Sequence, residues 1–307
     1  QNVDLTLNAR DYVDGVNASR TEFGFEFDVD GDGKIDTAKG DQTVTFGIAE
    51  GNRIQTRGGT LLSWKTPYDL NAAEKAQLTI TAEEVAAGNE DGIDLRVIRY
   101  GTMIYLFVEN RQVAVCDLTK CAKDGGDTAS GITADTKMFI FLRHYDDTRE
   151  AGVKIPFAIS TEVEPVQIAI SAANGTASTA ATVNHYVNNG RTTTTSNTHF
   201  AGEKIDLTVA PNKDYKTVGV VVDGTNVLSQ MVDNGAGALK YTFTASKAKH
   251  EITATFEQLM LFEEADTAKR KKQAGLEQAM DAFTDEEIKQ RICIDFSAVG
   301  DLKFAKY

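Results

Sequence analysis

Short apolar runs that alternate with polar residues fill the first half of the chain, and Gly, Asn and Asp residues separate them. Alternation with a period of two predicts β-strands that bury one face, and almost no stretch there has the 3.6-residue period of a helix. Gly101 and Asn110 stand between consecutive runs, where hairpin turns are expected. The predicted strands are Thr21–Phe27, Gln42–Ile48, Gln77–Thr81, Asp94–Tyr100, Met103–Glu109, Gln112–Asp117, Met138–Arg143 and Lys154–Ser160. The pattern is typical of a β-sandwich over residues 1–164.

A second β-rich segment follows from residue 165 to residue 258. Pro165 would end a strand, so we place a linker there. Apolar alternation within the segment predicts strands at Ile205–Ala210, Val218–Asp223 and Ile252–Phe256. We expect this segment to be a module of its own, because a chain of 307 residues exceeds one ordinary domain.

The last segment, residues 259–307, has a different character. Glu, Lys, Ala and Gln recur at helical spacing over Glu263–Ala282, and Thr284 with Glu287 forms a capping box for a second short helix. Ile292–Phe296 reads as a strand. The segment is too short to bury a core alone, so it either docks on the preceding module or begins a further domain of a larger protein.

The charge of the chain limits its partners. A formal net charge of −13 argues against nucleic acid and against anionic lipid, whose phosphates would be repelled. No run of about 18 apolar residues exists, so no membrane insertion is expected. A start at Gln1 fits a processed or trimmed chain, since a secretory leader would have been removed.

Three cysteines in 307 residues do not make a disulfide framework. Cys116 and Cys121 are close enough in sequence for a disulfide that bridges a turn, and the alternative is that both stay reduced. Cys293 reads as a buried apolar residue. The four scattered histidines offer no zinc motif.

Residues 201–257 carry a family resemblance. The runs AGEKIDLTVAPNKDYKTVGVVVDG and YTFTASKAKHEITATFE resemble the small β-rich, β-grasp-like repeat of bacterial surface proteins, the internalin B-repeat type. That family usually has Trp after its Gly, whereas Val220 follows Gly219 here. The resemblance implies an extracellular or cell-wall location in a Gram-positive-type surface protein, with structural spacing or weak binding as the role of the repeat.

Residues 93–118 carry a second resemblance. The run IDLRVIRYGTMIYLFVENRQVAVCDL looks like the central strand pair of concanavalin-like or laminin-G-like jelly-roll domains. The resemblance implies a jelly-roll sandwich over residues 1–164, in a chain that is mainly β. Such sandwiches most often bind sugar in bacterial exoproteins, so it also implies a glycan or host glycoprotein as partner.

The sharpest local signal is a run of alternating carboxylates on a Gly-kinked loop, which can direct several oxygens at one cation. The expected Ca²⁺ ligands are Asp28, Asp30, Asp32, Lys34 through its carbonyl, Asp36 and Asp41. The loop resembles those of EF-hands and dockerins, but Lys39 stands where they supply a bidentate Glu. The alternative is an acidic solvated turn. If Ca²⁺ binds, its expected role is to stiffen the sandwich.

Sugar sites pair an aromatic platform with carboxylate or amide groups that bond to hydroxyls. Two clusters have this composition: Trp64 with Tyr68, and Arg143, His144, Tyr145, Asp146 and Asp147. The competing interpretations are a core tryptophan for the first cluster and a solvated hairpin loop for the second.

Catalysis is not expected. Glu26 and Asp28 resemble the start of the E-x-D-x-x-E strand of jelly-roll β-glucanases, but Gly31 replaces the second Glu. A retaining glycosidase needs both carboxylates, about 5–5.5 Å apart. We therefore expect a non-catalytic binding protein, with a glycan as its ligand. The alternatives are an adhesin for a host protein, a structural stalk, and a glycosidase whose carboxylates come from distant parts of the chain.

Overall fold

A computed structural model describes most of the first 258 residues. The described ranges are 2–9, 20–49, 53–59, 72, 76, 78–87, 93–120, 130–145, 157–187, 190–235 and 237–258. By its contacts the chain divides into two units. Unit 1 contains residues 1–167, 179–206 and 242–250, and unit 2 contains residues 168–178, 207–241 and 251–307.

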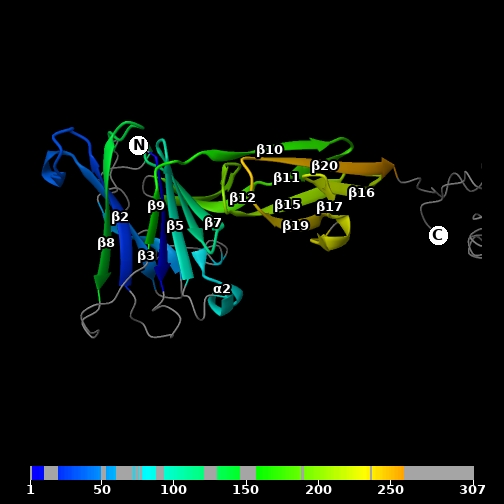
Figure 1. The fold of residues 1–307 in the computed structure, drawn as a ribbon, viewed down its shortest axis with the longest axis horizontal. Coiled ribbons are helices and arrows are strands. Elements are labelled where there is room, and N and C mark those ends of the chain that lie inside the picture. The colour runs from blue at the N-terminus through cyan, green and yellow to red at the C-terminus, as the bar shows by residue number, and fades with distance from the viewer. Residues whose placement is uncertain are drawn as a thin grey trace, which may run out of the picture. The chain divides into compact units, whose positions relative to one another are not determined.

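Unit 1 is built on two sheets that Figure 1 shows face to face. The larger has the order β13-β12-β7-β6-β5-β1-β9, and the smaller has the order β4-β3-β2-β8. The strands of the larger sheet are β1 (Val3–Ala9), β5 (Ile93–Tyr100), β6 (Met103–Val108), β7 (Arg111–Asp117), β9 (Phe157–Ser160), β12 (Ala181–Val187) and β13 (Gly190–Ser196). Those of the smaller sheet are β2 (Arg20–Asp28), β3 (Gln42–Ala49), β4 (Arg53–Gly59) and β8 (Lys137–Tyr145).

The core of unit 1 lies between these sheets. Strand β1 contributes every second residue to it, including Leu5 and Leu7, and β2 contributes Phe23, Phe25 and Phe27. This is the period-two alternation expected of strands that bury one face. The packing of two sheets over a shared apolar core confirms a sandwich-like, mainly β protein.

Seven of the eight strands predicted for the first segment are confirmed, with ends shifted by a few residues. The exception is Gln77–Thr81, whose described residues form no strand. Thr81 instead caps helix α2 (Ala82–Ala87): its Oγ1 accepts the N–H of Glu84, and the Glu84 carboxylate accepts the N–H of Thr81. This reciprocal capping box stabilises a helix start at a place where alternation alone predicts a strand.

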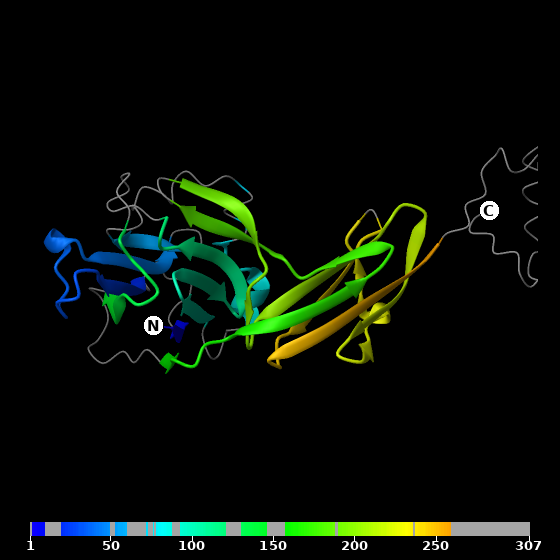
Figure 2. The same ribbon diagram turned by 90° about the horizontal axis from the view of Figure 1, so that it is seen from above.

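The outer face of the seven-stranded sheet is covered by later parts of the chain. Strand β12 pairs in parallel with β7, and Figure 2 shows the yellow-green β12–β13 hairpin beside the teal strands of the sheet. Phe200 packs edge-on against Tyr105 at 4.9 Å between ring centroids. Arg96 binds both carboxylate oxygens of Asp4 and donates to the carbonyl of Ala201 at 2.8 Å, which fastens this return segment.

Unit 2 contains residues of two further sheets, of orders β14-β10-β20-β16-β17 and β11-β15-β19-β18. The strands are β10 (Pro165–Ala172), β11 (Gly175–Ser178), β14 (His199–Phe200), β15 (Lys204–Pro211), β16 (Tyr215–Val222), β17 (Thr225–Asn226), β18 (Val232–Asp233), β19 (Leu239–Thr244) and β20 (Lys249–Gln258). Alternate residues of β15 and β20 are buried, among them Leu207, Val209, Ile252 and Phe256. The strands predicted at 205–210, 218–223 and 252–256 are confirmed.

Several expectations remain predictions. The module of residues 165–258 stays a prediction. So do the helices and the strand expected in residues 259–307, which lie outside the described residues. Cys116 is buried in β7. Cys121 and Cys293 lie outside the described residues, so the disulfide between Cys116 and Cys121 stays a prediction. In the part of the chain that is described, no helix has the length and apolarity needed to cross a membrane.

Candidate functional site

The acidic loop, residues 29–41, joins β2 to β3 in unit 1. These strands pair in antiparallel register with Phe27 opposite Gln42. Asp28, at the end of β2, is therefore beside Asp41, which immediately precedes β3. The strand pairing thus brings together two carboxylates that are thirteen positions apart in sequence.

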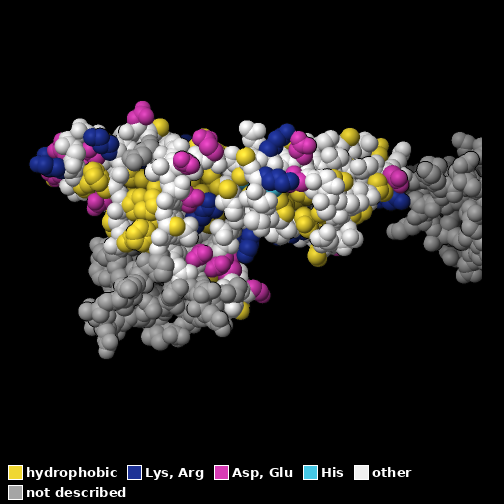
Figure 3. Space-filling view, in the orientation of Figure 1, with side chains coloured by type: hydrophobic (Ala, Val, Ile, Leu, Met, Phe, Trp, Pro, Cys, Tyr) yellow, Lys and Arg dark blue, Asp and Glu magenta, His cyan; other side chains and the backbone are white. Residues whose placement is uncertain are grey.

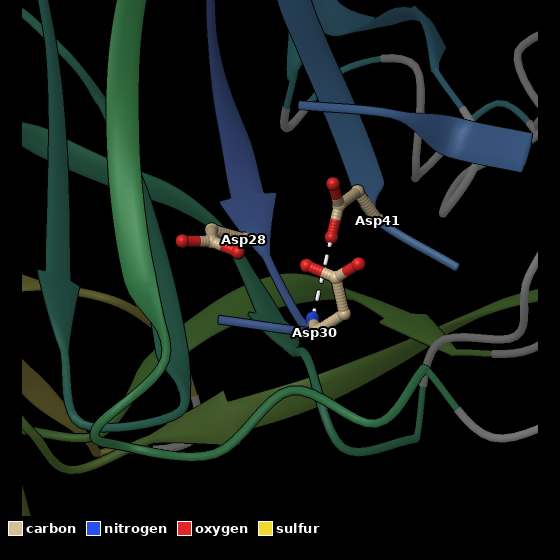
Figure 4. Close-up of side chains that lie close together, drawn as sticks. All are labelled: Asp28, Asp30 and Asp41. Atoms are coloured by element: carbon tan, nitrogen blue, oxygen red, sulfur yellow. Dashed lines mark hydrogen bonds between the residues drawn. The ribbon is translucent and has the colours of Figure 1, made fainter. Parts of the chain in front are cut away.

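Asp28, Asp30 and Asp41 form a cluster whose ligand atoms all lie within 4.8 Å of one another. Figure 4 shows the three carboxylates, with Asp41 accepting the N–H of Asp30. The side chain of Asp30 is exposed, but Asp28 and Asp41 are only 3% and 0% exposed. Carboxylate oxygens are the ligands that hard divalent cations prefer, so this triad can hold a metal ion.

Backbone N–H groups hold the Asp28 carboxylate in place. Its Oδ1 accepts the N–H of Gly31 at 2.8 Å, and its Oδ2 accepts the N–H of Gly33 at 2.9 Å. Both glycines have positive φ, of 78° and 81°, a conformation that other residues rarely adopt. The glycines therefore let the loop fold back over the end of β2.

The Asp41 carboxylate is held in the same way. Its Oδ1 accepts the N–H of Val29 at 2.8 Å, and its Oδ2 accepts the N–H of Asp36 at 2.7 Å. Each carboxylate oxygen has two lone pairs. Lone pairs on both buried carboxylates are therefore left over after these bonds, and they are available to a cation.

Two of the predicted ligands interact with a lysine instead. Lys39 lies 3.1 Å from the Asp32 carboxylate and 3.9 Å from that of Asp36. The N–H of Lys34 and the ammonium group of Lys39 lower the pKa of Asp32, while the Asp32 carboxylate raises the pKa of Lys39. The structure therefore gathers three of the five predicted carboxylates, Asp32 and Asp36 lie in separate ion pairs with Lys39, and the Lys34 carbonyl stays a predicted ligand.

Among the described residues, no Lys or Arg forms an ion pair with Asp28, Asp30 or Asp41. Carboxylates this close repel one another. A bound cation would remove that repulsion, which makes the cluster receptive to a metal.

The two predicted sugar clusters stay predictions. Trp64, Tyr68, Asp146 and Asp147 lie outside the described residues. Arg143, His144 and Tyr145 belong by their backbone to β8, which extends to residue 145, and their side chains also lie outside what is described.

An exposed aromatic side chain that the sequence analysis missed lies on the smaller sheet. Phe139 of β8 is 42% exposed, and its neighbours Met138 and Ile140 pack against the core. Phe139 lies opposite Glu26 of β2, which in turn lies opposite Thr43 of β3. Cross-strand neighbours on one face have their Cβ atoms about 5 Å apart. The sheet therefore presents a row of an aromatic ring, a carboxylate and a hydroxyl group.

This row continues toward the acidic loop. Asp28 follows Glu26 by two residues on β2, so both belong to the same face of the sheet. In the other direction Gly24 lies opposite Phe141, and a Cβ at Gly24 would lie 2.6 Å from the Phe141 ring. A glycine is thus required for that ring to lie over β2. We call the row Phe139, Glu26 and Thr43 the aromatic row.

A signal for the aromatic row existed in the sequence. Residues 138–142 read MFIFL, so both sets of alternate positions are apolar. A strand that covers a core with one face must turn the other set outward. One of the two sets therefore had to be exposed or covered separately.

Comparison of the chain with protein-family models, with curated proteins and with solved structures finds no match in any of the three.

Proposed function

We propose that this chain is a non-catalytic extracellular binding protein whose jelly-roll sandwich binds a glycan and is stiffened by Ca²⁺. The observation that carries the proposal is the aromatic row, which lies on an exposed sheet face and leads to the acidic triad. A location outside the cell, as part of a larger multidomain surface protein, is what the resemblances of the sequence imply and belongs to the same proposal, as does a monomeric state of this chain.

Calcium is the favoured cation because of the kind of ligand the loop offers. Asp28, Asp30 and Asp41 supply only oxygen, and Ca²⁺ takes six to eight oxygen ligands in flexible geometry. Backbone carbonyls of the loop and water would complete the set. Mg²⁺ demands a nearly ideal octahedron and gives up water reluctantly, so it fits an irregular loop less well.

A glycan is the favoured ligand because of the chemistry of the aromatic row. The Phe139 ring offers an apolar surface for the C–H face of a pyranose, while Glu26 and Thr43 offer oxygens to its hydroxyls. The net charge of −13 disfavours acidic sugars. We therefore expect a neutral glycan.

The test of glycan binding is a glycan and mucin array probed with the whole chain, with Ca²⁺ and again with EDTA. Binding in Ca²⁺ that falls in EDTA is the expected result. Phe139→Ala should weaken it about tenfold or more, and Phe157→Ala, which removes a ring 59% exposed on another strand, is the matched control. A blank array from folded, Ca²⁺-loaded protein would overturn the glycan proposal.

The test of the cation site is calorimetric titration with Ca²⁺. Asp30→Ala should abolish binding and cost the loop little, because the Asp30 side chain only accepts the N–H of Asp32. Asp36→Ala should keep binding, since Asp36 is not in the triad. Equal loss in both variants would favour the wider ligand set expected from the sequence.

A protein-binding adhesin is the second candidate, and one observation favours it. Phe157 and Ile159 of β9 are 59% and 49% exposed, and β9 is the outermost strand of the larger sheet. Figure 3 shows a continuous apolar area in the part of the view where Figure 1 draws β8 and β9. An extended peptide could pair with such an edge. Loss of glycoprotein binding in Phe157→Ala but not in Phe139→Ala would support this candidate.

A further inference from the structure

Two Asn-Gly pairs of unit 2 lie in exposed turns, and their backbone bonding differs. Asn174 lies between β10 and β11, whose first residue is Gly175, while Asn234 and Gly235 lie between β18 and β19. The third pair of the chain, Asn189 and Gly190, lies partly outside the described residues. Asn-Gly is chemically special because glycine has no side chain to shield its backbone nitrogen from the preceding amide.

The Gly175 N–H is left out of the strand ladder. The N–H of Asn212 donates to the carbonyl of Asn174 at 3.1 Å, and Gly175 is the partner of Pro211 in the register. Since hydrogen-bonded and non-hydrogen-bonded pairs alternate in an antiparallel ladder, Gly175 and Pro211 form a non-hydrogen-bonded pair. The Gly175 N–H thus points away from β15. Because β11 is the outermost strand of its sheet, no ladder bond holds that group.

The Gly235 N–H is held. It donates to Oδ1 of Asp233 at 2.8 Å, and the turn is closed by the N–H of Asn234 donating to the carbonyl of Ala238 at 2.7 Å. The two pairs therefore have the same sequence, and both asparagines are exposed, but the pairs differ in whether the glycine nitrogen is engaged.

We propose that Asn174 is a site of spontaneous deamidation and that Asn234 is protected. The Gly175 nitrogen loses its proton to water or hydroxide and attacks Cγ of the Asn174 amide. A new C–N bond closes a succinimide, and the side-chain nitrogen leaves as ammonia. Water then opens the ring at either carbonyl and yields aspartate or isoaspartate. Attack within one dipeptide needs no encounter step, so a nitrogen without a hydrogen bond favours the reaction.

The site cannot be removed by replacing its glycine. A Cβ at Gly175 would lie 2.3 Å from the Phe256 ring, so packing in unit 2 requires glycine at this position. Asn174 has a φ of 69°, a conformation that Asn adopts more readily than most residues. The reactive pair is therefore a by-product of a tight turn beneath a buried ring.

The test is incubation of the folded full chain at mildly alkaline pH, followed by peptide mapping with mass spectrometry and isoaspartate labelling. Asn174 should convert several-fold faster than Asn234. The same incubation of the unfolded chain should bring the two rates together, because the sequences are alike at the reacting atoms. Equal rates in the folded chain, or a faster Asn234, would overturn the proposal.

Two variants test the cause. Asp233→Ala removes the acceptor of the Gly235 N–H, and it should raise the rate at Asn234 several-fold while leaving Asn174 unchanged. Asn174→Ser should remove the modified peptide altogether. If Asp233→Ala leaves the Asn234 rate unaltered, the hydrogen bond is not what protects that turn.

Discussion

Two loops at one end of unit 1 are fastened by buried charges of opposite sign. The acidic loop is tied by Asp28 and Asp41, which accept backbone N–H groups. The loop of residues 130–136, which we call the arginine loop, is tied by Arg99, which donates to backbone carbonyls. The loops are neighbours, since a Cβ at Gly131 would lie 3.0 Å from the Val29 side chain.

Arg99, which ties the arginine loop, uses nearly all of its hydrogen-bond donors. Nε of Arg99 donates to Gly101, Nη1 donates to Thr136, and Nη2 donates to Thr133 and, at 3.4 Å, to Ala134. These are four bonds from the five N–H donors of a guanidinium. Arg99 also lies over the Phe27 ring at 5.3 Å, and its burial lowers its pKa.

The two buried carboxylates of the acidic loop keep hydrogen-bond acceptor positions that no backbone N–H occupies. Asp28 accepts two N–H groups and Asp41 accepts three, so these bonds occupy five of the about eight lone-pair sites that the two carboxylates offer. A buried charge can thus serve as a closed structural tie or as an open site. The difference lies in how many of its bonding positions the backbone already occupies.

Arg99→Met should give the largest effect. The substitution keeps an apolar stem but leaves the carbonyls of Thr133 and Thr136 without partners, so we expect a loss of about 3 kcal/mol or more in the free energy of unfolding. Urea denaturation measures it. Arg99→Lys keeps the charge with three donors and should lose less. If both variants are as stable as the original chain, Arg99 does not tie the loop.

Stabilisation by bound Ca²⁺ should be the second-largest effect. At a Ca²⁺ concentration 100 times the dissociation constant, binding to the acidic loop should raise the free energy of unfolding by about 2.7 kcal/mol. The melting temperature should then be higher than in EDTA. In Asp28→Asn this gain should vanish, because the triad loses a charge and an oxygen. A gain that survives in Asp28→Asn would place the cation elsewhere.

Removal of the Lys39 charge should strengthen Ca²⁺ binding by the acidic loop. Its ammonium group neutralises Asp32 and Asp36 at the edge of the acidic loop. Lys39→Met leaves more negative charge near the triad, and Ca²⁺ affinity measured by calorimetry should rise a few-fold, more at low salt than at high salt. An unchanged affinity at low salt would show that Lys39 does not act on the triad.

The pH dependence of the Lys39–Asp32 pair should be the smallest effect, since both groups are exposed to solvent. The lowered pKa of Asp32 gives a contribution that is present above its unfolded pKa and is lost as the pH falls below about 4. The raised pKa of Lys39 gives one that is lost as the pH rises above about 10. Unfolding curves of the original chain and of Lys39→Met should differ less at both extremes than at neutral pH.

Local patterns in the sequence predicted many of the strands of both segments and the position of the acidic loop. They could not select Asp28, Asp30 and Asp41 from six candidates, because the selection depends on the register of β2 with β3 and on where Lys39 reaches. Charged residues are normally exposed. Nothing local therefore indicated that Arg99, near the end of a predicted strand, would be fully buried.

Long-range pairing was also beyond local patterns. Thr-rich β13 and its partner β12 are not among the predicted strands, yet they extend the larger sheet beside β7. A parallel pairing between residues about 70 positions apart leaves no period in the sequence, since nothing near residue 184 specifies Ala114 as its neighbour.

The return of the chain to the seven-stranded sheet sets the order in which the protein can mature during synthesis. The face that carries Tyr105 and Phe107 is complete in sequence long before Phe200, which covers it, has left the ribosome. Until then the nascent chain exposes aromatic rings and the open edge of β7. A chain that stops at residue 164 would keep them exposed, and we expect it to need a chaperone or to aggregate.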